Sequence, residues 1–249
     1  MKKKSVMVVL SGGQDSVTCL LEAKELYEHV HCISFDYGQR HKRELDAARN
    51  ACTIIGVDSH EVVNVAGLLR SRSPLVDQSA TLETYTDYES MDKVIGDRVE
   101  LTFVPLRNPF FLLVAANYAI AKDCYTVMTG ICAMDNANYP DCTREFAIHM
   151  EFMMNEALGL NRANYAGERM HIEAPLLGLD KAGTVKLALS HGELGRRAMA
   201  ITHTCYAGEF PPCGKCHSCV LRAEGFHQAG EVDPLVERGR EYLAHAGHQ

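Results

Sequence analysis

A glycine-rich stretch near the amino terminus carries residues suited to binding a phosphate group. An apolar run from Val6 to Leu10 is followed by Ser11-Gly12-Gly13-Gln14-Asp15-Ser16, and apolar residues then recur at helical spacing. This pattern predicts a strand, a tight turn and the start of a helix. Glycines let the backbone approach an anion closely, and the first N–H groups of a helix have no intrahelical partner. The stretch therefore predicts a phosphate-binding loop.

This stretch differs from two familiar phosphate-binding motifs. No Gly-Lys-Ser/Thr follows the glycines, as it does in a Walker loop, and the third glycine of the dinucleotide fingerprint is missing. The simpler alternative is an ordinary strand-to-helix turn capped by Ser and Asp. Both glycines and the preceding apolar strand favour nucleotide binding. The predicted nucleotide contacts are Leu10, Ser11, Gly12, Gly13, Gln14, Asp15, Ser16, Val17, Thr18, Cys19 and Leu20.

Four cysteines near the carboxyl end have the spacing of a metal site. Cys213, Cys216 and Cys219 form a C-x-x-C-x-x-C run, and Cys205 precedes them. Two-residue spacing lets consecutive thiolates converge on one ion, and four thiolates with no open position fit a closed tetrahedral zinc site. An iron–sulfur cluster is the alternative, since it also uses closely spaced cysteines. The loop is rich in Gly and Pro, so the metal is expected to provide its stability.

Strand and helix patterns alternate around these motifs. Short apolar runs predict strands, and apolar residues at every third or fourth position predict the helices between them. The expected strands are 6–10, 30–35, 60–65, 125–130 and 170–174, and the expected helices are 15–28, 45–55, 109–121, 146–157 and 181–189. Alternating strands and helices form parallel sheets with right-handed crossovers. The predicted fold class is α/β, a doubly wound, five-stranded parallel sheet with a small carboxyl-terminal zinc-binding, helical extension.

The polar span from 66 to 100 shows no lasting periodicity. A span of that length inside a compact domain is usually a functional lid or a disordered loop. No repeat or linker divides the first 195 residues. We therefore expect one domain over 1–195 and a zinc-binding and helical region over 196–249.

Composition narrows the possible functions. The 249-residue chain has a net charge of −7, which argues against broad electrostatic binding to nucleic acid and favours a small-molecule substrate. No apolar run is long enough to cross a bilayer, and the five apolar residues after Lys2-Lys3-Lys4 are too few for a signal peptide. We expect a cytoplasmic protein without membrane or nucleic-acid partners, whose cysteines are thiols or metal ligands.

The amino-terminal loop resembles the pyrophosphate loop of the N-type ATP pyrophosphatases, which cleave ATP to AMP and pyrophosphate in order to adenylate an oxygen. Five stretches in chain order also resemble the 7-cyano-7-deazaguanine synthase family. They are LSGGQDS from Leu10, FDYGQRH from Phe35, TFVPLRN from Thr102, YPDC from Tyr139, and HTCY from His203 with the cysteine run that follows it. Together these stretches span nearly the whole chain.

The resemblance implies an ATP-dependent ligase that forms carbon–nitrogen bonds. Members of this family convert 7-carboxy-7-deazaguanine and ammonia to 7-cyano-7-deazaguanine (preQ0) in queuosine or related 7-deazapurine biosynthesis. The carboxylate is adenylated first, and the amide that ammonia forms is adenylated in turn. Mg²⁺ would be shared between phosphate oxygens and Asp15. The family also implies a homodimer.

The resemblance assigns roles to several polar residues. Arg107 and Lys181 would counter phosphate charge, while Asp135, Tyr139 and Asp141 would read the purine-like edge or move protons. The simpler alternative for each is a surface salt bridge or a helix cap. The predicted catalytic residues are Asp15, Arg107, Asp135, Asp141 and Lys181. The predicted substrate contacts are Tyr37, Gln39, Arg40, His41, Arg107, Asn108, Tyr139 and Asp141.

The chain departs from the family pattern at a few positions. Leu106 and Gly183 stand where the family has a glycine and a glutamate, Thr143 replaces an arginine, and Asp135-Asn136-Ala137-Asn138 replaces Asp-Tyr-Ser-Gly. Three alternatives stay open: an enzyme that joins the activated acid to another amine, a transfer-RNA thiolation enzyme, and a binding module without catalysis. Pyrophosphate release with 7-carboxy-7-deazaguanine and ammonium separates them.

Overall fold

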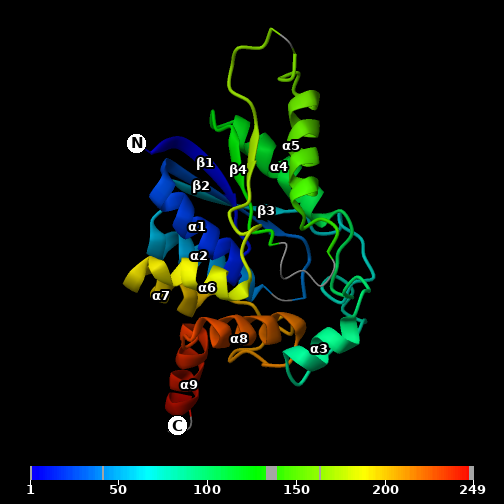
Figure 1. Ribbon diagram of the computed structural model, residues 1–249, viewed down its shortest axis with the longest axis vertical. Helices are drawn as coiled ribbons and strands as arrows, with labels where there is room; N and C mark the ends of the chain where they lie inside the picture. The colour runs from blue at the N-terminus through cyan, green and yellow to red at the C-terminus, as the bar shows by residue number, and fades with distance from the viewer. Residues whose placement is uncertain (1, 41, 133–138, 163, 247–249) are drawn as a thin grey trace.

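A five-stranded sheet forms the centre of the computed structural model, which describes residues 2–40, 42–132, 139–162 and 164–246 (Figure 1). All neighbouring strands run parallel, in the order β3-β2-β1-β4-β5. The predicted five-stranded parallel sheet is confirmed. The strands are β1 (Lys3–Val9), β2 (Tyr27–Asp36), β3 (Ser59–Asn64), β4 (Thr126–Met128) and β5 (His171–Glu173).

Helices cover both faces of this sheet, so the fold is doubly wound. The helices on one side are α1 (Gln14–Leu26) and α2 (Arg43–Ile55), with α6 (Lys181–Ser190) and α7 (Gly192–Ile201) packed on them. The helices on the other side are α4 (Arg107–Ile120) and α5 (Arg144–Ala157). Each of the five helices predicted over 15–189 is confirmed within a few residues.

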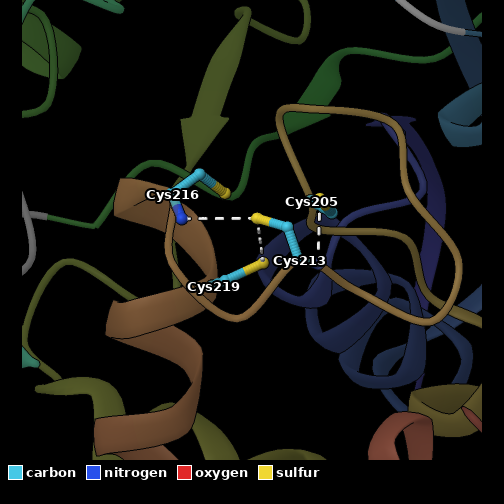
Figure 2. A group of neighbouring side chains, drawn as sticks. All are labelled: Cys205, Cys213, Cys216 and Cys219. Atoms are coloured by element: carbon cyan, nitrogen blue, oxygen red, sulfur yellow. Dashed lines mark hydrogen bonds between the residues drawn. The ribbon is translucent and has the colours of Figure 1, made fainter. Parts of the chain in front are cut away.

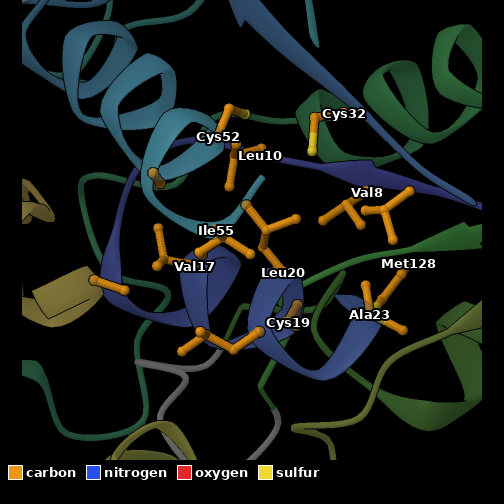
Figure 3. Packing of buried hydrophobic residues seen from close by; sticks show 14 of the residues in the cluster. Val8, Leu10, Val17, Cys19, Leu20, Ala23, Cys32, Cys52, Ile55 and Met128 are labelled. Carbon is orange, nitrogen blue, oxygen red and sulfur yellow. The ribbon is translucent and has the colours of Figure 1, made fainter. Parts of the chain in front are cut away.

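Strand β1 contributes side chains to two hydrophobic cores, because successive side chains of a strand point to opposite faces of the sheet. Val6 and Val8 enter the core shared with α1 and α2, part of which Figure 3 shows, and Met7 enters the core shared with α4. All three are at most 1% exposed. Full burial of such a side chain contributes about 1.5–3 kcal/mol. A strand buried on both faces reads as one continuous apolar run, which is why it was recognisable in the sequence.

One part of the span from 66 to 100 is helical, which was not predicted from the sequence. Helix α3 (Tyr88–Ile95) begins with a capping box: Asp87 accepts a hydrogen bond from the N–H of Ser90 (2.8 Å), and the Ser90 hydroxyl accepts one from the N–H of Asp87 (3.2 Å). The apolar residues of α3 pack against α8 (His217–Ala229). A helix this short is stable only through such packing.

The carboxyl-terminal helices lie at the end of the molecule away from α5 (Figure 1). Helix α8 packs on α6, and α9 (Pro234–Ala246) packs on α7. Buried Arg222 of α8 donates hydrogen bonds to both carboxylate oxygens of Asp233 (2.6 and 2.8 Å) and to Thr202 Oγ1 (2.8 Å). This bidentate pair fixes the start of α9 against the rest of the fold. Within the described residues, no helix combines the length and the apolar character needed to cross a bilayer.

Candidate functional site

A cavity of about 280 Å³ lies at the carboxyl ends of β1, β2 and β4. Strands β2 and β4 flank β1 on opposite sides, so the connections that follow these strands diverge beside β1. Open parallel sheets bind ligands at such a topological switch point. The polar wall residues include Ser11, Gln14, Asp15, Ser16, Tyr37, Gln39, Arg40, Glu44, Arg107, Asn108, Thr129, Tyr139, Lys181, His203, Thr204, Tyr206 and His217.

The Ser16 hydroxyl holds the predicted phosphate-binding loop in shape. Its Oγ accepts hydrogen bonds from the N–H groups of Ser11 and Gly12 (3.2 Å each) and donates one to the carbonyl oxygen of Gly13 (3.0 Å). The N–H of Gly13 donates to Ser11 Oγ (3.2 Å). The donors left for an anion are therefore those of the first turn of α1, which have no intrahelical partner.

Only part of the stretch predicted to contact the nucleotide reaches the cavity. Leu10, Ser11 and the residues from Gly13 to Ser16 line its wall. The next four residues, Val17, Thr18, Cys19 and Leu20, are completely buried and do not belong to the wall. Gly12 lies behind the loop against the backbone of α2. These five residues shape the loop through packing.

Two predicted catalytic residues, 166 positions apart, meet beside the loop. Lys181 is the first residue of α6, and its Nζ lies 3.1 and 3.0 Å from the two carboxylate oxygens of Asp15 in α1. The Lys181 side chain is 13% exposed and that of Asp15 is 32% exposed, so the pair borders the cavity instead of open solvent. The contact with Asp15 therefore places the Lys181 ammonium group beside the first turn of α1.

Arg107, at the start of α4, presents a guanidinium group to the cavity. Burial lowers its pKa, but the phenols of Tyr37, Tyr206 and Tyr139 and the carboxyl of Asp141 more than offset this, so the net shift of the pKa is upward. In the described part of the chain no carboxylate oxygen lies within 4.0 Å of this group. Arg107 is thus a permanent charge in the wall that can accept an anionic ligand.

The residue before this arginine explains one departure from the family pattern. Leu106 caps α4 with a φ of 61°, in the left-handed region, and its side chain is exposed. This conformation costs a residue other than glycine about 1–2 kcal/mol. The glycine that the family has here would adopt the same turn without that cost. The left-handed conformation of Leu106 sets the direction in which the chain enters α4, where Arg107 is the first residue.

The polar residues after β2 mainly hold the cavity wall together. Gln39 Oε1 accepts a hydrogen bond from the N–H of Tyr37 (2.9 Å). Arg40 donates to the carbonyl oxygens of Pro74 (3.4 Å), Gln78 (3.1 Å) and Ala80 (3.3 Å). The Arg40 guanidinium is therefore committed to the loop that follows β3. His41 lies outside the described residues.

Tyr139 reaches the cavity from the far side. Its hydroxyl lies 2.5 Å from Thr102 Oγ1 and 3.4 Å from Glu100 Oε2. Glu100 is 2% exposed and also accepts hydrogen bonds from the N–H and hydroxyl of Thr102. Burial raises the pKa of Tyr139, as does the nearby Glu100, so the phenol stays protonated and can donate.

Asp141 lies beside the cavity but not on its wall. It is 8% exposed, and burial raises its pKa although Arg107 acts in the opposite direction. Asn108, which is on the wall, donates from Nδ2 to the carbonyl oxygen of Asp141 (3.5 Å). Asp135, the remaining predicted catalytic residue, lies outside the described residues.

The cavity also contains residues that the sequence did not single out. Glu44 of α2 faces it, and burial raises the pKa of this carboxyl to about 7 although Arg107 lowers it. His203, Tyr206 and His217 enter the wall from the region around the cysteines. His203 and Tyr206 belong to the same HTCY stretch that carried the family resemblance, which was the available signal. No sequence pattern pointed to Glu44, because it approaches Arg107 only in the folded chain.

The four cysteines converge as predicted (Figure 2). All four Sγ atoms lie within 4.8 Å of one another, and those of Cys213 and Cys219 are 3.9 Å apart. A tetrahedral ion with sulfur bonds of about 2.3 Å places its ligands about 3.8 Å apart. The N–H of Cys213 donates to Cys205 Sγ (3.5 Å), and the N–H of Cys216 donates to Cys213 Sγ (3.4 Å), an arrangement that stabilises thiolates. The donor set can hold one metal ion.

The chain is similar to known proteins over nearly its whole length. Residues 5–230 match the family model described as "Queuosine biosynthesis protein QueC". A 7-cyano-7-deazaguanine synthase from Laribacter hongkongensis is 43% identical, covering 93% of this chain and 94% of its own. Those from Gloeobacter violaceus and Oceanobacillus iheyensis are 40% and 38% identical, covering 96% and 94% of this chain and 98% and 99% of their own.

Proposed function

Because the chain belongs to the 7-cyano-7-deazaguanine synthase family, we propose that it converts 7-carboxy-7-deazaguanine and ammonia to 7-cyano-7-deazaguanine with ATP, in queuosine or related 7-deazapurine biosynthesis. The observation that carries this proposal is one cavity that joins the anion-binding first turn of α1 to the guanidinium of Arg107, which has no carboxylate oxygen within 4.0 Å among the described residues. The reaction needs both features, because a triphosphate and a carboxylate must meet there. The enzyme is a ligase that forms a carbon–nitrogen bond.

The carboxylate must be activated before ammonia can replace its oxygen. Its attack on the α-phosphate of ATP makes AMP the leaving group, and the step is promoted mainly by positioning and charge stabilisation. We assign the pyrophosphate end to the first turn of α1, where the N–H groups of Gln14, Asp15 and Ser16 can donate. Lys181 supplies positive charge there, and Asp15 would hold a bound Mg²⁺, whose charge would offset the negative charge that develops on the phosphates.

Arg107 is assigned to the carboxylate of the deazaguanine. Its charge and cavity position support this role, and the three surrounding phenols give the ring system an aromatic wall. Tyr139 and Asn108 stay proposed substrate contacts because they line the same wall. After ammonia displaces AMP, the family reaction adenylates the amide oxygen, and elimination gives the nitrile.

Arg107→Lys is expected to raise the KM for 7-carboxy-7-deazaguanine by about 10–100-fold, because lysine keeps the charge but loses the bidentate fork. The KM for ATP should change by less than about 3-fold, since the loop is untouched. Steady-state pyrophosphate release at varied concentrations of each substrate measures both constants. Equal increases in the two KM values would contradict this division of roles.

The proposed function is tested by incubating the purified protein with ATP, Mg²⁺, ammonium and 7-carboxy-7-deazaguanine. We expect AMP and pyrophosphate to form only when the deazaguanine is present, and mass spectrometry to find the nitrile. Pyrophosphate without nitrile would indicate a different acceptor amine. If no pyrophosphate forms, the protein would be a binding module without catalysis, and the proposal would fail.

We further propose that the four cysteines hold a structural Zn²⁺. The short separation of their sulfurs supports a single ion over an iron–sulfur cluster, which must place several irons between its ligands. We also propose a cytoplasmic homodimer with a catalytic domain over 1–195 and a zinc-binding, helical region over 196–249. The exposed apolar side chains of Ile148 and Phe152 on α5 support a covered surface there.

A further inference from the structure

Glu44 is a carboxyl group in the cavity wall that neither the phosphate-binding turn nor the proposed carboxylate site at Arg107 uses. It lies in the first turn of α2, and the carbonyl of the same residue abuts Gly12 of the phosphate-binding loop. No hydrogen bond to its carboxyl oxygens occurs among the described residues. Burial raises its pKa to about 7, while Arg107 lowers it. The group can therefore both accept and release a proton near neutral pH.

The neighbours of Glu44 leave this carboxyl available. Arg107 faces it from α4, and Tyr37, whose pKa is raised by burial and by Glu44, faces it from the segment after β2. Asp15 is the other carboxyl group on the described wall, and it is paired with Lys181. Of these two carboxyls, Glu44 is thus the one without a cation within 4.0 Å among the described residues.

The proposed reaction, on which this inference rests, requires proton acceptors. Ammonia is mostly ammonium at neutral pH, and ammonium has no lone pair with which to attack a carbonyl. Converting an acyl adenylate and ammonium to an amide and AMP releases two protons in all. The first must leave before the carbon–nitrogen bond forms. A carboxylate beside the acyl group can bind the cation and remove that proton in one place.

We infer that Glu44 is the catalytic base that binds ammonium in the cavity and takes its first proton. The ionised carboxylate accepts one N–H proton and leaves neutral ammonia. The nitrogen lone pair then forms the bond to the acyl carbon, and the bond to AMP breaks with its electron pair on the phosphate oxygen. The second proton leaves the new nitrogen as the amide forms, and Glu44 returns its own proton to water.

Two half-reactions separate this role from the function as a whole. Isotope exchange between pyrophosphate and ATP, with 7-carboxy-7-deazaguanine but no ammonium, reports adenylation alone. Glu44→Gln should keep this exchange within about 3-fold and slow amide and nitrile formation by about 10²–10⁴-fold, the usual contribution of a general base. The matched control is Asp46→Asn, which neutralises an exposed carboxylate on the same helix and should change neither rate.

Two further readouts exclude a merely structural effect. In the wild type, kcat/KM for ammonium should rise with pH through about 7, because Glu44 must be ionised before ammonium binds, and this limb should be absent in Glu44→Gln. Hydroxylamine is largely unprotonated at neutral pH, so it should restore product formation, as hydroxamate, to Glu44→Gln more than ammonium does.

Amide formation at the wild-type rate in Glu44→Gln, or a parallel loss of exchange and amide formation, would overturn the assignment of Glu44. Absence of exchange in the wild type is a different result. It would remove the proposed function and this inference with it.

Discussion

Gly12→Ala is expected to abolish ATP-dependent pyrophosphate release and to lower the free energy of unfolding by about 2–5 kcal/mol. Gly12 has a φ of 89°, and a Cβ there would collide with the carbonyl oxygen of Glu44 and lie 2.7 Å from the backbone nitrogen of Ala48. Both obstacles are backbone atoms of α2, so neither can rotate away. The loop and the start of α2 would have to separate, which moves the donors of the first turn of α1.

Gly13→Ala is the matched control for this change. Gly13 has a φ of −77°, and an added Cβ would come no closer than 3.4 Å to Ser11 Oγ. Its free energy of unfolding should change by less than about 1 kcal/mol. Urea denaturation of both variants measures the difference, and isothermal titration with ATP measures binding. Similar stability of the two alanine variants would contradict the close approach of Gly12 to α2.

Cys216→Ser is expected to lose the bound metal and most of the nitrile-forming activity. A structural zinc contributes about 10–16 kcal/mol in isolated peptides, which is comparable to the whole free energy of unfolding of a typical domain. The loop that the four cysteines draw together carries Thr204 and Tyr206 into the cavity wall. The same loop holds the long segment before α3, because the N–H of Tyr85 donates to the carbonyl of Lys215 (2.8 Å). Losing the ion should therefore open two sides of the cavity.

Three measurements on Cys216→Ser check this. Elemental analysis should fall from one zinc per chain to well below one, proteolysis should cut the 202–219 loop, and nitrile formation should drop by at least about 10-fold. Cys124→Ser is the control, since this buried thiol lies in the core that β1 shares with α4, away from the four cysteines, and donates to the carbonyl oxygen of Thr126, as serine can also do. A variant that has lost its zinc but keeps full activity would show that the metal does not support the cavity.

Much of the fold could be predicted because its signals are local. The strands buried on both faces read as apolar runs, and the helices show the three-to-four-residue spacing of one buried side. Helix α3 was missed because only two of its residues are buried, against a helix far along the chain. The strand limits were also approximate. Strand β2 begins at Tyr27, which is buried, three residues before the predicted start at 30.

The site was predictable only where its residues are neighbours in the chain. The phosphate-binding turn and the cysteine run have that property, and their spacing alone limits what they can bind. Glu44 and Arg107 come from helices whose packing on opposite sides of the sheet brings them to one cavity, and no spacing in the chain records this. The burial of Val17 to Leu20 likewise follows from how α1 packs, which excludes them from the wall.

By itself, the sequence determined the parallel α/β class, the glycine-rich turn after β1, the cysteine cluster that can hold a metal ion, and the family, because each depends on short-range order or on matching residues. Only the tertiary structure decided which donors of the turn are free, that Lys181 pairs with Asp15, and that Glu44 lies in the wall with no cation within 4.0 Å among the described residues. These are contacts between distant segments, and packing and burial in the folded chain set both their geometry and their pKa values.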